Sequence, residues 1–208
     1  MTPGRSGRQK KFKDKPRKSS NKLPIAVGLM IIIVVVVVAV YMFSANNPIN
    51  SGEPVGKVLL QTSMGDIIIQ LRDDRPITTG NFKNLIEQGV YDGTIFHRVK
   101  ADFMIQGGDP TGTGYGDPSI PEIQDELKGA NENDRGTISM ANTGYPNTGS
   151  SQFFINVVDN NYLDTKHTVF GKVISGMDVV DAISVVDTNP ADDRPFADVT
   201  LIKAEIIS

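Results

Sequence analysis

Two stretches of the sequence carry most of the side chains that could do chemistry. Residues 96–114 read FHRVKADFMIQGGDPTGTG, and residues 139–155 read SMANTGYPNTGSSQFFI. They combine one arginine with several large apolar side chains and with amide side chains, and they lack an activated nucleophile. Such a set can hold a peptide, whereas cutting one by covalent catalysis requires a nucleophile and an adjacent base. The two stretches therefore predict a peptide-binding site without bond-breaking chemistry.

Other chemistries find less support in the sequence. The glycine-rich run at residues 107–116 lacks the Gly-Lys-Ser/Thr ending of a phosphate-binding loop. Acidic pairs such as Asp73 and Asp74 lie in loop-like stretches, which favours solvated charge over glycosidase-type chemistry. The chain has no cysteine and only two histidines, which excludes disulfides and thiolate catalysis. We therefore expect neither a metal nor a cofactor.

Short apolar runs bounded by turn residues predict the strands that would position these side chains. The eight predicted strands cover residues 58–61, 66–71, 94–99, 103–106, 137–140, 152–158, 168–174 and 199–207. The first two flank the turn residues Ser63, Met64 and Gly65, which predicts a hairpin. Because a closed sheet has no exposed edges, closing the strands into a barrel is one stable arrangement.

Two helices are predicted beside these strands. The first follows Pro76, places Phe82, Leu85 and Ile86 at helical spacing, and ends before Gly89. The second begins after Ser175, which has capping-box spacing to Asp178. Its buried face would consist of Met177, Val180 and Ile183.

The N-terminal part of the chain differs from the rest in composition. Residues 1–22 contain nine Lys or Arg and one acid, a net charge of +8, whereas residues 57–208 contain 12 basic and 22 acidic residues, a net charge of −10. Between them, residues 25–43 are 19 residues without a charge. At ~1.5 Å per helical residue they would span ~28 Å, close to the hydrocarbon thickness of a bilayer.

These features predict a basic cytoplasmic tail (1–22), a transmembrane anchor (23–43), a flexible linker (44–56) and one globular domain (57–208). Basic residues favour the cytoplasmic side of a span, so we expect the domain outside the cell membrane. The alternative is a cleaved signal peptide, whose apolar core is usually ~7 to 15 residues long. A nucleic-acid-binding arm is less consistent with a basic tail beside an apolar span, so no nucleic acid partner is expected.

Six segments occur in an order that matches a known family. FHRV, FMIQGGD, GTG, SMAN, SQFFI and LDTKHTVFGKV resemble the cyclophilin family of peptidyl-prolyl cis/trans isomerases, and the resemblance covers residues 57–207. It implies a mainly β fold, a closed eight-stranded antiparallel β-barrel capped by two α-helices, here preceded by one transmembrane helix. It also implies proline-containing polypeptides as substrates. We expect a monomer.

The resemblance also assigns site residues, one position at a time. Arg98 and Gln106 fall on catalytic positions, with Gln106 expected to orient Arg98. The substrate-binding positions fall on Phe103, Met104, Gly112, Ala141, Asn142, Gln152, Phe154, Leu163 and His167. His97, beside Arg98, would face the other side of its strand and is interpreted as structural. Tyr162 stands where well-studied members often carry Trp, a position associated with cyclosporin, so sensitivity to that inhibitor stays open.

Elementary chemistry explains why such residues suffice. A prolyl amide has a rotation barrier of ~18 to 20 kcal/mol because its C–N bond has partial double-bond character. In the twisted transition state this resonance is lost, and the nitrogen regains a lone pair that can accept a hydrogen bond. A guanidinium beside it, from Arg98, would stabilise that state more than either planar state. The apolar side chains would hold the ring while the preceding carbonyl turns.

Taken alone, each of these residues would be interpreted as surface charge or core, and it is their joint order that favours a site. We predict a membrane-anchored peptidyl-prolyl isomerase that acts outside the cytoplasm on proline-containing segments of exported or cell-surface proteins. The alternatives are a tethered proline-peptide-binding or chaperone module with little turnover, and a purely structural surface domain.

Overall fold

The computed structural model describes residues 56–207. The predicted basic tail and apolar span lie outside the described residues, as does the predicted linker up to residue 55, so these remain predictions. Among residues 56–207, no helix has the length and apolar character needed to cross a bilayer.

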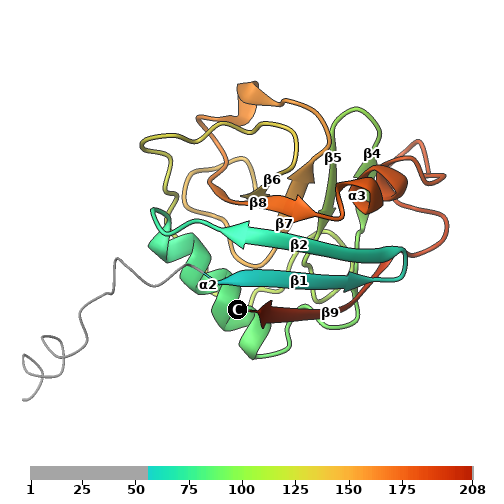
Figure 1. Ribbon diagram of the computed structural model, residues 1–208, viewed down its shortest axis with the longest axis horizontal. Coiled ribbons are helices and arrows are strands. Elements are labelled where there is room, and N and C mark those ends of the chain that lie inside the picture. Colours follow the sequence, from blue (N-terminus) through green and yellow to red (C-terminus); the bar gives the residue numbers. More distant parts are fainter. Residues whose placement is uncertain (1–55, 208) are drawn as a thin grey trace, which may run out of the picture. The chain divides into compact units, whose positions relative to one another are not determined.

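One curled antiparallel sheet dominates the described part of the chain (Figure 1). Its strands are β1 (Lys57–Thr62), β2 (Gly65–Leu71), β3 (Thr94–Ile95), β4 (Arg98–Lys100), β5 (Met104–Gly107), β6 (Thr137–Met140), β7 (Phe153–Asn156), β8 (Val169–Ser175) and β9 (Thr200–Ile207). They are ordered β3-β9-β1-β2-β8-β6-β7-β5-β4. The predicted hairpin is confirmed, since β1 and β2 pair antiparallel up to Thr62 and Gly65.

The sheet ends in two edge strands, which differs from the expected closed eight-stranded barrel. The predicted strand 94–99 is interrupted: β3 pairs with β9, β4 pairs with β5, and within residues 56–207 no ladder joins β3 to β4. The two residues between them are buried against different neighbours. Phe96 meets the ring of Phe153 edge-on, and His97 lies against Gly114. The chain therefore bends out of one ladder before it enters the next, and the sheet forms a half-barrel.

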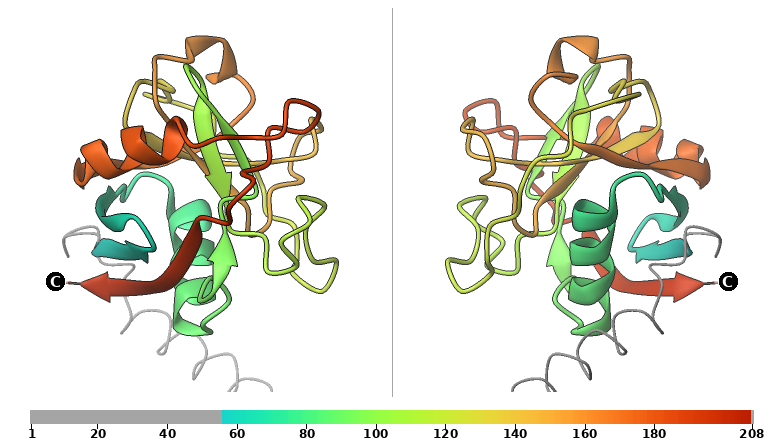
Figure 2. Two further views of the ribbon diagram at one scale, coloured as in Figure 1. Left: turned by 90° about the vertical axis from the view of Figure 1, so that its right-hand side faces the viewer. Right: turned by 90° about the vertical axis from the view of Figure 1, so that its left-hand side faces the viewer.

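The first helix agrees with its prediction. Helix α2 (Pro76–Glu87) has Pro at its start, where the missing N–H costs nothing, and ends before Gly89. The ring of Phe82 lies 5.0 to 5.5 Å from those of Tyr91, Phe153 and Phe170. α2 packs beside β9 and β8, as two views of the ribbon show (Figure 2). It thereby closes one end of the main core.

The second helix, α3 (Met177–Ser184), forms where predicted but begins differently. Its N-cap is Gly176 in the left-handed conformation, with φ of 84° and no side-chain cap, so the capping box predicted from Ser175 is wrong. A Cβ at Gly176 would lie 2.2 Å from the backbone oxygen of Asp66. Close contact with β2, rather than capping chemistry, therefore requires this glycine.

Buried apolar side chains form two separate clusters. The larger one fills the inside of the sheet beneath α2 and α3 and includes Phe82, Ile105, Phe153 and Phe170. The smaller one consists of Met104, Phe154 and Leu163, with Phe103 and Ala141 packed against it. Leu163 belongs to the short 3₁₀-helix η1 (Asn161–Leu163). The smaller cluster lies on the other face of β5 and β7.

Candidate active site

A cavity of about 200 Å³ lies over the smaller cluster. Nine of the eleven predicted site residues line it: Arg98, Phe103, Met104, Gln106, Ala141, Asn142, Phe154, Leu163 and His167. Gln152 lines a neighbouring cavity, and Gly112 lines neither. The fold therefore gathers residues from β4, β5, β7, η1 and three loops at one place.

The register of three strands explains how the central residues meet. Arg98 in β4 pairs with Gln106 in β5, and Gln106 pairs with Phe154 in β7. Directly opposite residues of antiparallel strands share one face of the sheet, so the three side chains form a row across it. Val99, Ile105 and Ile155 form the adjacent row and belong to the larger core. Because side chains alternate along each strand, Arg98, Gln106 and Phe154 face the cavity and the adjacent row faces the core.

The apolar floor of the cavity is small and well defined. Met104, Phe154 and Leu163 are 2%, 4% and 8% exposed, so only a small part of each surface meets solvent. Tyr162 stacks on Phe103, with ring centroids 6.3 Å apart and an interplanar angle of 19°. Since Tyr162 is largely exposed, it extends the apolar rim. The floor and rim together suit a small apolar ring.

His167 is held at the edge of this floor in a defined protonation state. Its Nδ1 lies 3.0 Å from the backbone oxygen of Met140, which can only accept, so Nδ1 carries the proton. Its ring stands edge-on to Phe154 at 5.2 Å. Burial lowers the pKa of His167, although the Met140 carbonyl acts in the opposite direction. The imidazole is therefore neutral at pH 7 and adds no charge to the cavity.

Arg98 is oriented by other groups than expected. The amide of Gln106 donates to Oε1 of Gln152 at 2.9 Å, and the Gln152 amide donates to the backbone oxygen of Gly114 at 3.1 Å. Nε of Arg98 instead donates to Asp193 at 3.3 Å, and its Cζ lies 5.8 Å from the centroid of the Phe103 ring. The expected pairing of Gln106 with Arg98 is absent from the hydrogen bonds of residues 56–207. Gln106 contributes to the wall of the site.

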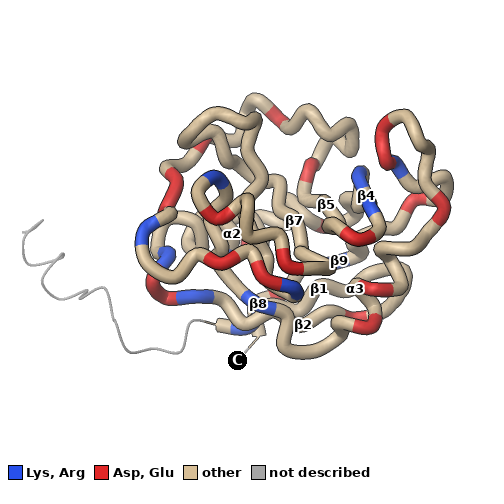
Figure 3. Tube along the Cα trace, turned by 90° about the horizontal axis from the view of Figure 1, so that it is seen from above, with Lys and Arg blue, Asp and Glu red and all other residues tan. Residues whose placement is uncertain are grey.

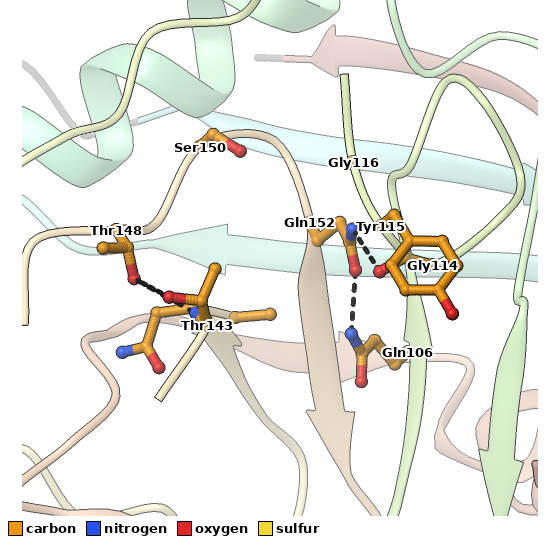
Figure 4. Close-up of a pocket in the computed structure, with 10 residues that line it drawn as sticks. Gln106, Gly114, Tyr115, Gly116, Thr143, Thr148, Ser150 and Gln152 are labelled. Carbon is orange, nitrogen blue, oxygen red and sulfur yellow. Dashed lines mark hydrogen bonds between the residues drawn. The ribbon is translucent and has the colours of Figure 1, made fainter. Parts of the chain in front are cut away.

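A second cavity, of about 130 Å³, adjoins the first (Figure 4). It shares Gln106, Ala141 and Asn142 with the first cavity and is otherwise lined by Gly114, Tyr115, Gly116, Thr143, Thr148, Ser150 and Gln152. The chain of hydrogen bonds from Gln106 through Gln152 to Gly114 runs along its edge. The two cavities therefore share part of their lining, and together they are called the groove.

The loop that carries Gly114 and Tyr115 is built around a carboxylate that sequence reasoning missed. Asp109 is fully buried and accepts hydrogen bonds from Thr111 and from the backbone N–H groups of Gly114 and Gly116. Burial alone would raise its pKa, but these hydrogen bonds together lower it, so the carboxylate stays ionised. An aspartate two residues before a threonine in a glycine-rich turn is a recognisable signal for such a loop.

Two predicted residues take part differently from the rest. Gly112 has a φ of 66°, and its carbonyl accepts from Arg194 at 2.9 Å, so it shapes the same loop without lining the groove. The side chain of Asn142 donates to the backbone oxygen of Lys166 and accepts from Gly144. These two bonds hold the amide in place, and the expected substrate contact through the Asn142 backbone stays a prediction. Across residues 56–207, no group of three His, Asp or Glu side chains is placed to bind a metal ion.

Comparison with known protein families supports the same interpretation. Residues 57–206 match the family model described as cyclophilin type peptidyl-prolyl cis-trans isomerase/CLD. The chain is 46% identical over 161 residues to peptidyl-prolyl cis-trans isomerase-like 1 of Homo sapiens, which covers 76% of this chain and 95% of the relative. It is 44% identical over 154 residues to the protein of that name from Gibberella zeae, covering 72% and 94%.

A solved structure has the same fold. The crystal structure of a cyclophilin-type peptidyl-prolyl cis-trans isomerase from Cryptosporidium parvum has a TM-score of 0.70 and 33% identity, and the match covers 74% of this chain and 98% of that one. A second structure of that protein, in the presence of the dipeptide Ala-Pro, has a TM-score of 0.69, again with 33% identity, over 73% of this chain and 99% of that one.

Proposed function

The chain belongs to the cyclophilin-type peptidyl-prolyl cis-trans isomerase family, and we propose that Arg98 stabilises the twisted transition state of an X-Pro bond held in the 200 Å³ cavity. The reaction makes and breaks no covalent bond. Its barrier of ~18 to 20 kcal/mol reflects amide resonance, so a group that favours the resonance-free state lowers it. The observation that carries the proposal is the row formed by Arg98, Gln106 and Phe154 above an apolar floor.

The floor supplies the binding half of the mechanism. Met104, Phe154 and Leu163 would hold the pyrrolidine ring, with His167 neutral at its edge. The guanidinium of Arg98 lies at the side of the cavity, near the Phe103 ring. It would face the nitrogen of a prolyl ring held on this floor. A fixed donor aimed at charge that develops only in the transition state needs no reorganisation during the reaction.

The rest of the groove would hold the peptide chain. Gln152 and the Asn142 backbone are the groups placed to bind residues flanking the proline. Substrates with an X-Pro bond are supported by the related structure determined in the presence of Ala-Pro. Binding the chain on either side leaves only rotation about the prolyl bond free.

The test is the exchange rate of an X-Pro peptide, measured by NMR exchange spectroscopy with the full-length protein. Arg98→Ala should slow catalysed exchange by about 100-fold, the effect of removing one preorganised donor, while the peptide still binds. Arg98→Lys should recover little, because lysine lacks the planar fork. Arg135→Ala is the matched control, since Arg135 is similarly exposed and is ion-paired with Asp181 away from the cavity. Equal rates for wild type and Arg98→Ala would remove Arg98 from the mechanism.

The second candidate is a proline-peptide-binding or chaperone module with little turnover. The apolar floor would serve binding alone equally well, whereas the placement of Arg98 favours catalysis. The two are separated by the same experiment: peptide binding with an exchange rate equal to that of the free peptide would favour the binding module.

We further propose that the domain acts outside the cytoplasm on exported or cell-surface proteins, anchored through residues 25–43. The support is the sequence alone: 19 uncharged residues, with +8 before them and an acidic domain after them. Protease added to intact cells should then digest the domain. Digestion only after lysis would contradict this location.

A further inference from the structure

The carboxylate of Asp193 lies next to Arg98. We propose that Asp193 is a positioning residue that holds Arg98 by its Nε and so turns the two terminal amino groups of the guanidinium toward the prolyl bond. The inference rests on the role proposed above for Arg98. It replaces the orienting role expected of Gln106.

The alternation of β4 places Asp193 over the correct face of the strand. Val99 is buried in the larger core, so Arg98 and Lys100 both point to the other side. Oδ2 of Asp193 lies 3.3 Å from Nε of Arg98 and 3.6 Å from Nζ of Lys100. One carboxylate therefore serves both cations of the strand, and Figure 3 shows the basic residues of β4 near an acidic loop.

The backbone of Asp193 is fixed where this contact requires it. Its carbonyl accepts from the N–H of Val99 at 2.8 Å, and its N–H donates to the carbonyl of Asn189 at 2.9 Å. The N–H of Asn189 donates in turn to the carbonyl of Arg194 at 2.8 Å. Asp193 adopts a left-handed conformation with φ of 59°. Asp and Asn adopt this conformation more readily than most residues, so both the strand contact and the ion pair form without a glycine.

The contact with Asp193 uses Nε of Arg98 and not its terminal amino groups. Within residues 56–207, Nε makes the only side-chain hydrogen bond of Arg98. The two terminal amino groups remain available for a substrate, while the Phe103 ring limits the guanidinium on another side. The Arg98 side chain is 39% exposed, and an arginine that exposed would otherwise sample several rotamers. Holding Nε removes that freedom without occupying the donors that face the cavity.

Two substitutions test this clamp, which is the contact between the Asp193 carboxylate and Nε of Arg98, without straining the backbone. Asp193→Gly removes the side chain and keeps the left-handed conformation, and Asp193→Asn removes the charge but keeps an acceptor. We expect Asp193→Gly to lower the exchange rate at saturating peptide about fivefold, the scale of a partly exposed ion pair, with peptide affinity unchanged. Asp193→Asn should reduce the exchange rate about half as much on a logarithmic scale, because charge-assisted bonds are about twice as strong as neutral ones.

Asp192→Asn is the matched control. It removes the same charge from the adjacent position, where, among the hydrogen bonds of residues 56–207, the carboxylate accepts only from the backbone of Arg194. It should leave turnover at the wild-type level. All variants are compared in the full-length protein, after thermal unfolding has shown that their midpoints are equal.

A double variant separates positioning from general damage to the loop. If Asp193 acts through Arg98, then Asp193→Gly should have no further effect on turnover in the Arg98→Ala background. Wild-type turnover in Asp193→Gly, or a fivefold loss that persists in that background, overturns the clamp and leaves the role of Arg98 intact. Wild-type turnover in Arg98→Ala overturns both.

Discussion

Phe153 and Phe154 are neighbours in β7, and they serve opposite purposes. Both are nearly inaccessible to solvent, at 0% and 4% exposure. Phe153 packs against the rings of Phe82, Tyr91 and Phe96 in the larger core, whereas Phe154 meets His167 over the smaller cluster. Successive side chains of a strand face opposite sides, so one residue closes the interior and the next forms the floor of a groove.

The comparison shows that burial alone does not separate core from site. The two clusters differ in whether other parts of the chain cover them. α2 and α3 cover the larger cluster, and its buried members are at most 9% exposed. Nothing among residues 56–207 covers the smaller cluster above its floor, which leaves the cavity of about 200 Å³. A small apolar cluster with one open side is available for an apolar ligand.

The largest effect of breaking this arrangement should come from Phe153. Phe153→Ala removes a ring that touches three others, and such core truncations cost about 3 to 5 kcal/mol. Urea unfolding monitored by circular dichroism should show this loss in the free energy of unfolding. A loss below about 1 kcal/mol would mean that the two faces of β7 are not energetically distinct.

Phe154→Ala should give the reverse balance of effects. Its free energy of unfolding should fall by less than half as much, because its cluster has only two other buried members. Catalysed exchange should slow by about 10- to 100-fold, since burying an aromatic ring against apolar surface contributes about 1.5 to 3 kcal/mol. Phe154→Leu is the control for volume, and its exchange rate should lie between those of wild type and Phe154→Ala. Turnover that survives in Phe154→Ala would place the proline elsewhere.

Most of the fold and floor could be predicted because they follow from local pattern. Phe82, Leu85 and Ile86 predicted α2, and short apolar runs bounded by turn residues predicted the strands that carry Met104 and Phe154. The bend at Phe96 and His97 could not be predicted, because each of those side chains finds a partner far away in sequence. Gly176 was missed for the same reason, since its requirement comes from the backbone of Asp66.

The two aspartates beside the groove show the same limit. Asp109 bonds within its own loop, over seven residues, so its role is encoded locally. Asp193 meets Arg98 across 95 positions, and no local pattern indicates that contact. Sequence reasoning gave the orienting role to Gln106, which instead pairs with Gln152. Long-range polar contacts are set by loop conformation, which sequence spacing does not report.

The two histidines extend the comparison of core and groove to pH, with the smallest expected effect. Burial lowers the pKa of both His97 and His167 below the ordinary value of about 6.5. Between each folded pKa and that value, the unfolded chain binds more protons than the folded one. Their contribution to stability is therefore complete above about pH 6.5 and is lost as the pH falls through the folded pKa. Unfolding experiments between about pH 7 and 5 should show this decline.

Peptide binding should respond to only one of the two. His167 lies at the edge of the cavity floor, where a second proton would place a charge against Phe154, whereas His97 lies outside that cavity and against Gly114. Peptide affinity should therefore decrease on acidification. His167→Gln should make this decrease smaller, whereas His97→Gln should leave it unchanged. NMR titration of the two rings assigns each pKa independently. If the pH dependence of binding survives in His167→Gln and vanishes in His97→Gln, the titrating group lies in the wall of the groove and not at the edge of its floor.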